Sequence, residues 1–305
     1  MVNQTSQTSV PTAHSRGSVG TLAVVALVLS GCCWGTGFVF GKIALAQMSV
    51  AENVTWRFIF GSLGLLPIVF LRWQPYTRRD WDSLLIASLI GVPIQFLVQF
   101  KGLQLTTVSH ASLMIGTLPI MLAMSSVVFL GERLHWQEWL SLAVATCGAV
   151  LIGLSHGIEA GGPEASARGD ALVVLSLLAA VVMVMITKKL IGRHDSLHVT
   201  SMMIVLGTLM LIAWTGATQP VRLNFTSSAW TGVAAQGFIA TAGAYLLWNW
   251  GLAKVPASRA GVFLNMEPLV GAVLGITILH EHLGLLALLG GAMVVGSAIH
   301  FSRIS

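Results

Sequence analysis

Of the 305 residues, 55% are hydrophobic and only 9% are charged, and the mean hydropathy is +0.83. A soluble globular domain carries about 25% charged residues, so the composition excludes a soluble domain and requires lipid around most of the surface. A net charge of +5 would suggest a nucleic-acid partner in a soluble protein, but here the basic residues lie between apolar runs and indicate orientation in a membrane instead.

The chain begins with a polar tail, residues 1–18, which we expect to be a disordered cytoplasmic segment. Ten apolar runs of spanning length follow, and runs of this kind predict transmembrane helices. The predicted fold is therefore an all-α polytopic membrane protein with ten transmembrane helices. The runs are 19–41, 53–71, 83–100, 109–130, 136–154, 171–187, 198–216, 231–250, 259–279 and 284–302.

The longest linker, residues 155–170, divides these spans five and five. At a constant offset of 149, residues 102–134 match residues 251–283 with 9 identities in 33 positions and no gap. Because five is odd, two consecutive five-helix repeats must insert in opposite senses, as in transporters with inverted repeats. We therefore predict a first repeat at 19–154, an external linker at 155–170 and a second, inverted repeat at 171–302.

Loop charge gives an independent indication of orientation. With the N-terminus inside, the inner segments carry 11 basic residues and the outer segments carry 4. This positive-inside bias predicts that both termini are cytoplasmic. We expect the membrane to be a bacterial-type inner membrane. The inner residues are Arg16, Arg72, Arg78, Arg79, Arg133, Lys188, Lys189, Arg193, Lys254, Arg259 and Arg303; the outer ones are Lys42, Lys101, Arg168 and Arg222.

Four short motifs are similar to those of one family: Trp34-Gly35, Arg57-Phe58, Gly131-Glu132-Arg133-Leu134 and Glu267-Pro268. On these motifs the chain resembles the EamA-type drug/metabolite transporters over nearly its whole length, and within them it looks most like the bacterial aromatic amino acid exporters. The resemblance implies export of small molecules. The second half departs from the pattern, with His280-Glu281-His282-Leu283 where the first has Gly-Glu-Arg-Leu.

Spans three and eight hold the best candidates for a substrate cavity. Gln95 and Gln99 are four residues apart and share a helix face, as do Tyr245, Trp248 and Asn249. Amides and rings there would give an apolar site with a few hydrogen-bonding groups. The alternative is interhelical hydrogen bonding with an interfacial aromatic belt.

Other positions complete the predicted site. Trp34, Met114 and Asn265 are further candidates for substrate binding, although a Met is more often packed or lipid-facing. Gly35 belongs to a small-residue spacing that lets helices approach closely. We assign Gly35, Pro119 and Pro268 to hinges or packing.

Two charged residues lie inside spans. Glu267 lies near the membrane midplane beside Pro268, where it either accepts hydrogen bonds structurally or takes part in proton coupling or substrate contact. Arg57 is a few residues into span two, where its stem can snorkel, so we interpret it as a structural anchor rather than a substrate clamp. We expect no metal and no cofactor, because the Cys and His residues show no metal spacing.

These observations predict an exporter of small amphipathic metabolites that works by alternating access around a central cavity. Amino acids, especially aromatic ones, are the first choice of substrate. Export of other drugs or metabolites is the alternative. An intramembrane enzyme is a distant one, because it would need paired catalytic groups at depth. The expected partners are a small-molecule substrate and the lipid bilayer, without nucleic acid, and a monomer is compatible with the sequence.

Overall fold

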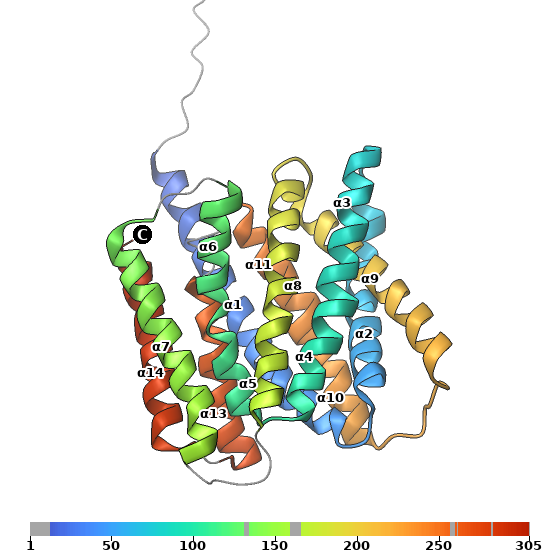
Figure 1. Cartoon of the computed structure of the whole chain (residues 1–305). Coiled ribbons are helices and arrows are strands. Elements are labelled where there is room, and N and C mark those ends of the chain that lie inside the picture. The colour runs from blue at the N-terminus through green and yellow to red at the C-terminus, as the bar shows by residue number, and fades with distance from the viewer. Residues whose placement is uncertain are drawn as a thin grey trace, which may run out of the picture.

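The computed structural model describes residues 13–130, 134–158, 166–256, 260, 262–281 and 283–304. Over these ranges the chain is helical and has no strand, which confirms the all-α prediction (Figure 1). The first half contains α1 (Ala13–Leu45), α2 (Val50–Leu71), α3 (Arg78–Leu89), η1 (Ile90–Ile94), α4 (Gln95–Gln104), α5 (Val108–Ile115), α6 (Leu118–Leu130) and α7 (Trp136–Ile158). The second contains α8 (Ala167–Ile191), α9 (Ser196–Thr218), α10 (Ser227–Gly237), η2 (Phe238–Gly243), α11 (Ala244–Leu252), η3 (Val262–Asn265), α13 (Met266–Leu279) and α14 (Leu285–Ile304).

Many of these helices are suited to a bilayer. In the described ranges, five helical stretches are long and apolar enough to cross a membrane, and two shorter helices are also apolar. Large apolar side chains such as Phe70, Val128 and Trp136 are exposed, as expected where lipid replaces water. The five stretches are Thr21–Leu45, Val50–Leu71, Arg78–Gln104, Ala167–Ile191 and Ser196–Thr218.

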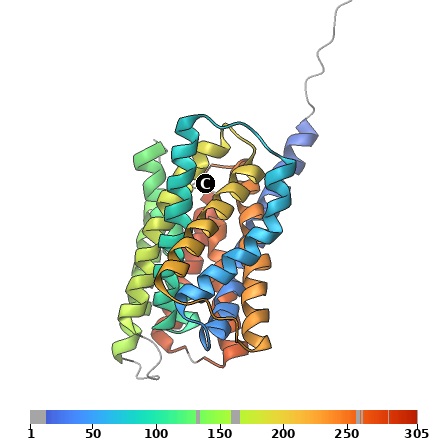
Figure 2. The same ribbon diagram turned by 90° about the vertical axis from the view of Figure 1, so that its right-hand side faces the viewer.

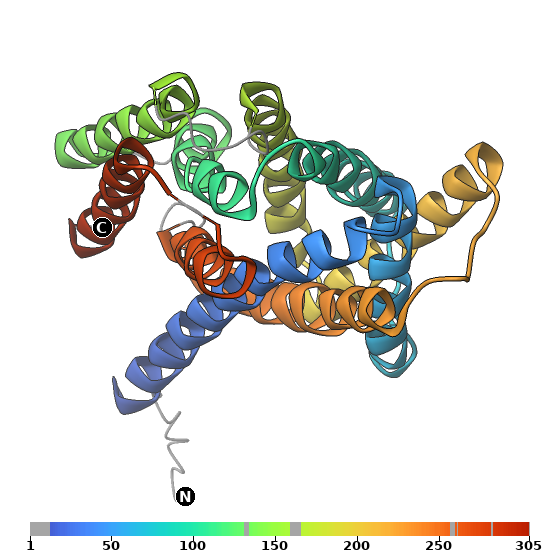
Figure 3. The same ribbon diagram turned by 90° about the horizontal axis from the view of Figure 1, so that it is seen from below.

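The helices run up and down, roughly side by side (Figure 1). The beginning of α1 and the end of α14 lie at the same end of the bundle. Seen along the bundle, α7 and α14 pack against each other at one edge of the molecule (Figure 3). The remaining helices gather around the middle, where the main apolar core lies.

Two of the long helices contain a π-helical segment near their middle. In η1, Pro93 has no backbone N–H, so it cannot complete the regular helical pattern. Adding the sequence offset of 149 to Ile90–Ile94 gives positions 239–243, which all lie inside η2. The uninterrupted spans expected at 83–100 and 231–250 are thus each divided at an equivalent place.

A second pair of interruptions also follows the repeat. The expected span 109–130 is broken between α5 and α6, and the span 259–279 contains the 3-10 segment η3 before α13. Gly116, at the first break, becomes position 265, the last residue of η3, when the offset is added. Hydrophobic runs do not reveal such breaks, because broken and continuous spans are equally apolar.

Two partly buried lysines near helix ends show that the side chains also follow the repeat. The Nζ atom of Lys42 donates hydrogen bonds to the carbonyl oxygens of Leu103 at 3.2 Å and Thr106 at 2.6 Å. Lys188 donates to the carbonyl oxygens of residues 252 and 255, which are the same two positions plus 149. In each half, a lysine near the end of one helix therefore satisfies carbonyls at the end of another.

The helices α2 and α9 lie side by side and are tied together along their length (Figure 2). An arginine that follows each helix pairs with an acid at the start of the other: Arg72 with Asp195 at 3.2 Å, and Arg222 with Glu52 at 2.6 Å. Hydrogen bonding to Glu52 raises the pKa of the Arg222 guanidinium above its usual value. Between these ends, the Thr55 and Thr215 hydroxyls lie 2.7 Å apart.

Candidate functional site: a central cavity

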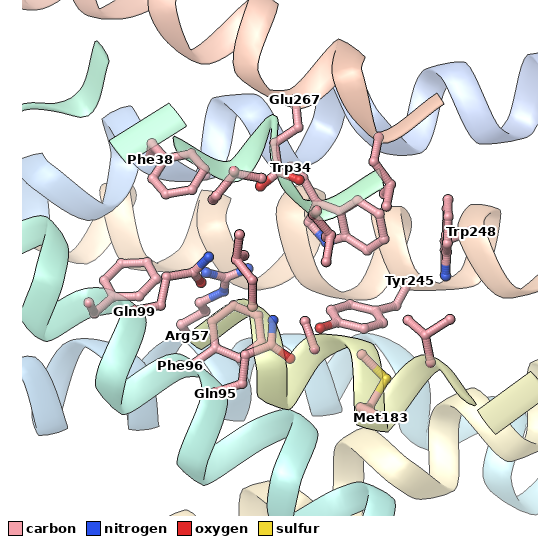
Figure 4. A pocket seen from close by; sticks show the side chains of 18 residues that line it. Trp34, Phe38, Arg57, Gln95, Phe96, Gln99, Met183, Tyr245, Trp248 and Glu267 are labelled. Atoms are coloured by element: carbon pink, nitrogen blue, oxygen red, sulfur yellow. The ribbon is translucent and has the colours of Figure 1, made fainter. Parts of the chain in front are cut away.

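A cavity of about 50 Å³ lies between the two halves of the chain (Figure 4). Its walls come from helices of both halves, including α1, α2, α4, α8, α11 and α13. Its volume has room for a few water molecules. The lining residues are Trp34, Gly37, Phe38, Arg57, Gln95, Phe96, Gln99, Phe100, Ile115, Leu118, Leu177, Ala180, Met183, Val184, Tyr245, Trp248, Leu264 and Glu267.

Three aromatic residues form one wall. The ring of Trp34 meets that of Tyr245 edge to face, with centroids 5.2 Å apart, and lies 5.6 Å from Trp248. Tyr245 and Trp248 are both buried, each with 2% of its surface exposed. Rings in this arrangement offer a large apolar surface with polar atoms at its edge.

Two amides from α4 face the same space. Gln95 and Gln99 line the cavity one helical turn apart, as their spacing predicts. The Oε1 atom of Gln95 is buried and has no hydrogen-bond partner in the described part of the chain. Buried polar atoms normally have such partners, so this oxygen is an available acceptor for a bound molecule.

The structure corrects the interpretation of Arg57. Its side chain does not snorkel toward the membrane surface but is 3% exposed and lines the cavity. Its Nε atom donates to Thr241 Oγ1 at 2.8 Å, and its Nη2 atom donates to the carbonyl oxygen of Ala240 at 3.2 Å. The guanidinium also lies 4.5 Å from the centre of the Phe96 ring. The acceptors in η2 therefore hold the guanidinium in the interior of the protein.

Glu267 lies in the first turn of α13, directly after the 3-10 segment, and is 7% exposed. Its carboxylate points into the cavity (Figure 4). No residue that the structure describes donates a hydrogen bond to it. Pro268 lies in the same first turn, where a backbone N–H is dispensable.

The cavity gathers six of the residues singled out from the sequence: Trp34, Gln95, Gln99, Tyr245, Trp248 and Glu267. Met114 and Asn249 are buried but do not line it. The side chains of Asn265 and Pro119 lie outside the described residues, as does the motif at 131–133. Arg57 also lines the cavity, and the sequence signal for this role is that Arg57 and Glu267 are opposite charges within apolar spans.

Gly35 supports the cavity by letting α1 approach α13. A Cβ atom at this position would lie 2.7 Å from the backbone oxygen of Glu267 and 2.8 Å from Val270 Cβ. We expect Gly35→Val to lower the free energy of unfolding by about 1–3 kcal/mol, because backbone would have to move. Thermal unfolding in detergent measures the change.

Gly216→Ala is the matched control, because a Cβ atom there meets nothing within 4 Å. It should stabilise the protein by about 0.5–1 kcal/mol, the usual advantage of alanine over glycine inside a helix. A Gly35→Val protein as stable as wild type would contradict the close approach.

Comparisons with known proteins find relatives and a shared fold over most of the chain. The chain is 25% identical over 287 residues to the uncharacterized transporter YetK of Bacillus subtilis (strain 168), covering 90% of this chain and 84% of YetK. It is 26% identical over 288 residues to a probable terminal-alkyne amino-acid exporter of Streptantibioticus cattleyicolor, covering 92% of this chain and 93% of that exporter. A crystal structure of a protein 16% identical in sequence shares the fold, with a TM-score of 0.68 over 96% of this chain and 98% of the other.

The family relationship extends through both halves. The profile of the EamA-like transporter family matches residues 21–154 and also residues 167–303, which lie on either side of the central linker. Together these matches include every residue that lines the cavity. The chain belongs to the EamA-like transporter family.

Proposed function

We propose that the protein exports small amphipathic metabolites across a bacterial-type inner membrane. The proposed substrates are amino acids, including aromatic ones. The observation that carries this proposal is the cavity, which combines the aromatic wall of Trp34, Tyr245 and Trp248 with the available amide of Gln95. Small-molecule sites are mostly apolar with a few placed polar groups. The related probable amino-acid exporter supports the amino-acid class.

We further propose ten spans in two inverted five-helix repeats. The support is that the family profile matches each half, that η1 and η2 obey the offset of 149, and that Lys42 and Lys188 bind equivalent carbonyls. An inverted repeat places the substrate site near the midplane between the halves. Residues from both halves line the cavity, which supports this expectation.

The small size of the cavity supports alternating access. At about 50 Å³ it is smaller than the several hundred Å³ of typical ligand sites, so an aromatic amino acid enters only after the walls separate. The π-helical segments adjoin the site, because Gln95 follows η1 directly and Tyr245 follows η2 by one residue. Such π-helical segments are frequent at functional sites, and we assign these two the role of hinges.

Flux into proteoliposomes tests this function. Purified protein should carry labelled phenylalanine and tryptophan across the bilayer, with and without a pH gradient, and protein-free liposomes give the background. Flux of other small drugs without flux of any amino acid would favour the alternative substrate class. No protein-dependent flux of either class would reject the proposed export.

Cysteine labelling tests the orientation. In a background without Cys32, Cys33 and Cys147, a cysteine at the exposed position Ala167 should react with an impermeant thiol reagent in intact cells. The exposed Arg79, at the opposite end of the bundle, gives the control Arg79→Cys, which should react only after lysis. The reverse pattern would show that the proposed orientation is wrong.

A further inference from the structure

The cavity contains two charged side chains of opposite sign. Arg57 comes from α2 and Glu267 from α13, so helices far apart in the sequence bring them to one space. Both line the cavity, yet no ion pair joins them, and the guanidinium donates to Thr241 and to the Ala240 carbonyl instead. Charges inside a membrane protein are costly and are usually paired. Two opposite charges that share a cavity without direct contact therefore indicate that a bound molecule lies between them.

Each charge has unused binding capacity. Arg57 uses its Nε and Nη2 atoms on Thr241 and Ala240, while its Nη1 atom makes no hydrogen bond within the described ranges. The Glu267 carboxylate likewise has no donor there, and the free Gln95 Oε1 atom adds a second acceptor. The cavity thus offers donors on one side and acceptors on another.

The chemistry of these groups selects a ligand. A guanidinium recognises a carboxylate, and a carboxylate recognises an ammonium group. An α-amino acid carries both charges on one carbon atom, and its net neutrality leaves Arg57 and Glu267 balanced when it binds. The aromatic wall of Trp34, Tyr245 and Trp248 supplies the surface for its side chain.

We propose that Arg57 binds the α-carboxylate and Glu267 the α-ammonium group of a zwitterionic amino acid, and that the pair determines selectivity for zwitterions. This proposal rests on the proposed export of amino acids. It assigns Arg57 a role beyond anchoring, since η2 holds the guanidinium in position and leaves Nη1 for the substrate. It also assigns Glu267 to substrate contact.

Competition with labelled tryptophan in proteoliposomes tests the pair. Tryptamine lacks the carboxylate, N-acetyltryptophan lacks the ammonium charge, and unlabelled tryptophan has both. Loss of one partner of a buried charged hydrogen bond costs roughly 2–5 kcal/mol, which corresponds to about 30-fold or more in affinity. We expect wild type to bind tryptophan at least ~30-fold more tightly than either analogue.

Variants then separate the two roles. Arg57→Gln should remove the preference for tryptophan over tryptamine while keeping the preference over N-acetyltryptophan. Glu267→Gln should do the reverse. A general loss of folding would weaken the binding of all three ligands together, so it could not remove one preference while keeping the other. Where flux is too slow, the ligand-induced rise in Tm gives the same ratios.

Ser62→Ala is the matched control, because Ser62 is a buried polar residue of α2 that bonds Thr208 at 2.7 Å and does not line the cavity. It should keep the wild-type ratios. If wild type carries tryptophan but the analogues compete equally, or if both variants keep the wild-type ratios, the zwitterion proposal is wrong and the export proposal stands. Absence of any amino-acid flux in wild type would reject the export proposal, and this one with it.

Discussion

Trp248→Ala should lower the free energy of unfolding by about 3–5 kcal/mol and abolish most amino-acid flux. The indole is among the largest fully buried side chains, and it packs against Trp34 with ring centres 5.6 Å apart. Truncation of such a residue loses its apolar contacts and leaves a void that the surrounding helices fill only in part. Chemical unfolding in detergent and flux in proteoliposomes measure the two effects.

Two comparisons separate stability from substrate contact. Trp248→Phe keeps a ring in the wall and should retain most of the stability, while the flux of tryptophan and phenylalanine still changes. Trp250, on the same helix, is only partly buried and lies 4.5 Å from Lys254 Nζ. Trp250→Ala should therefore cost about 1 kcal/mol or less. Equal losses for Trp248→Ala and Trp250→Ala would contradict the packing described for Trp248.

Lys42 and Lys188 each bridge two carbonyl oxygens at the end of another helix, and removal of either lysine should lower the free energy of unfolding by about 2–5 kcal/mol. In Lys188→Met, the carbonyl oxygens of Leu252 and Val255 lose a charged donor, and in Lys42→Met those at positions 103 and 106 do. Each carbonyl left without a partner away from water costs about 1–3 kcal/mol. Thermal unfolding of the two single variants checks the prediction.

The neighbouring Lys189 is a matched control. It is exposed, and Lys189→Met should change the free energy of unfolding by no more than about 0.5 kcal/mol. Because the two bridges occupy equivalent places, Lys42→Met and Lys188→Met should also have similar effects. A large difference between them, or no effect of either, would argue against the equivalence of the two halves.

Much of the fold could be predicted because a bilayer imposes long apolar helices, which hydrophobic runs reveal directly. The shared face of Gln95 and Gln99 follows from the helical period, and the structure places both on the cavity. Asn249 shares α11 with Tyr245 and Trp248 but is buried outside the cavity, and so is Met114, because helical spacing does not tell which residues the neighbouring helices cover. The depth of Arg57 depends on acceptors in η2, which lie more than 180 residues away and leave no local signal.

The π-helical segments determine which side chains the following helices present. A π turn holds one residue more than an α turn, so every later side chain is rotated by about 100° relative to an uninterrupted helix. Deletion of a single residue within Ile90–Ile94 would restore α-helical register and turn Gln95 and Gln99 away from the cavity, while the span stayed apolar. The same holds for Phe238–Gly243 and Tyr245. A one-codon deletion in either segment is therefore a route by which related chains can exchange one set of pocket residues for another without altering how they insert.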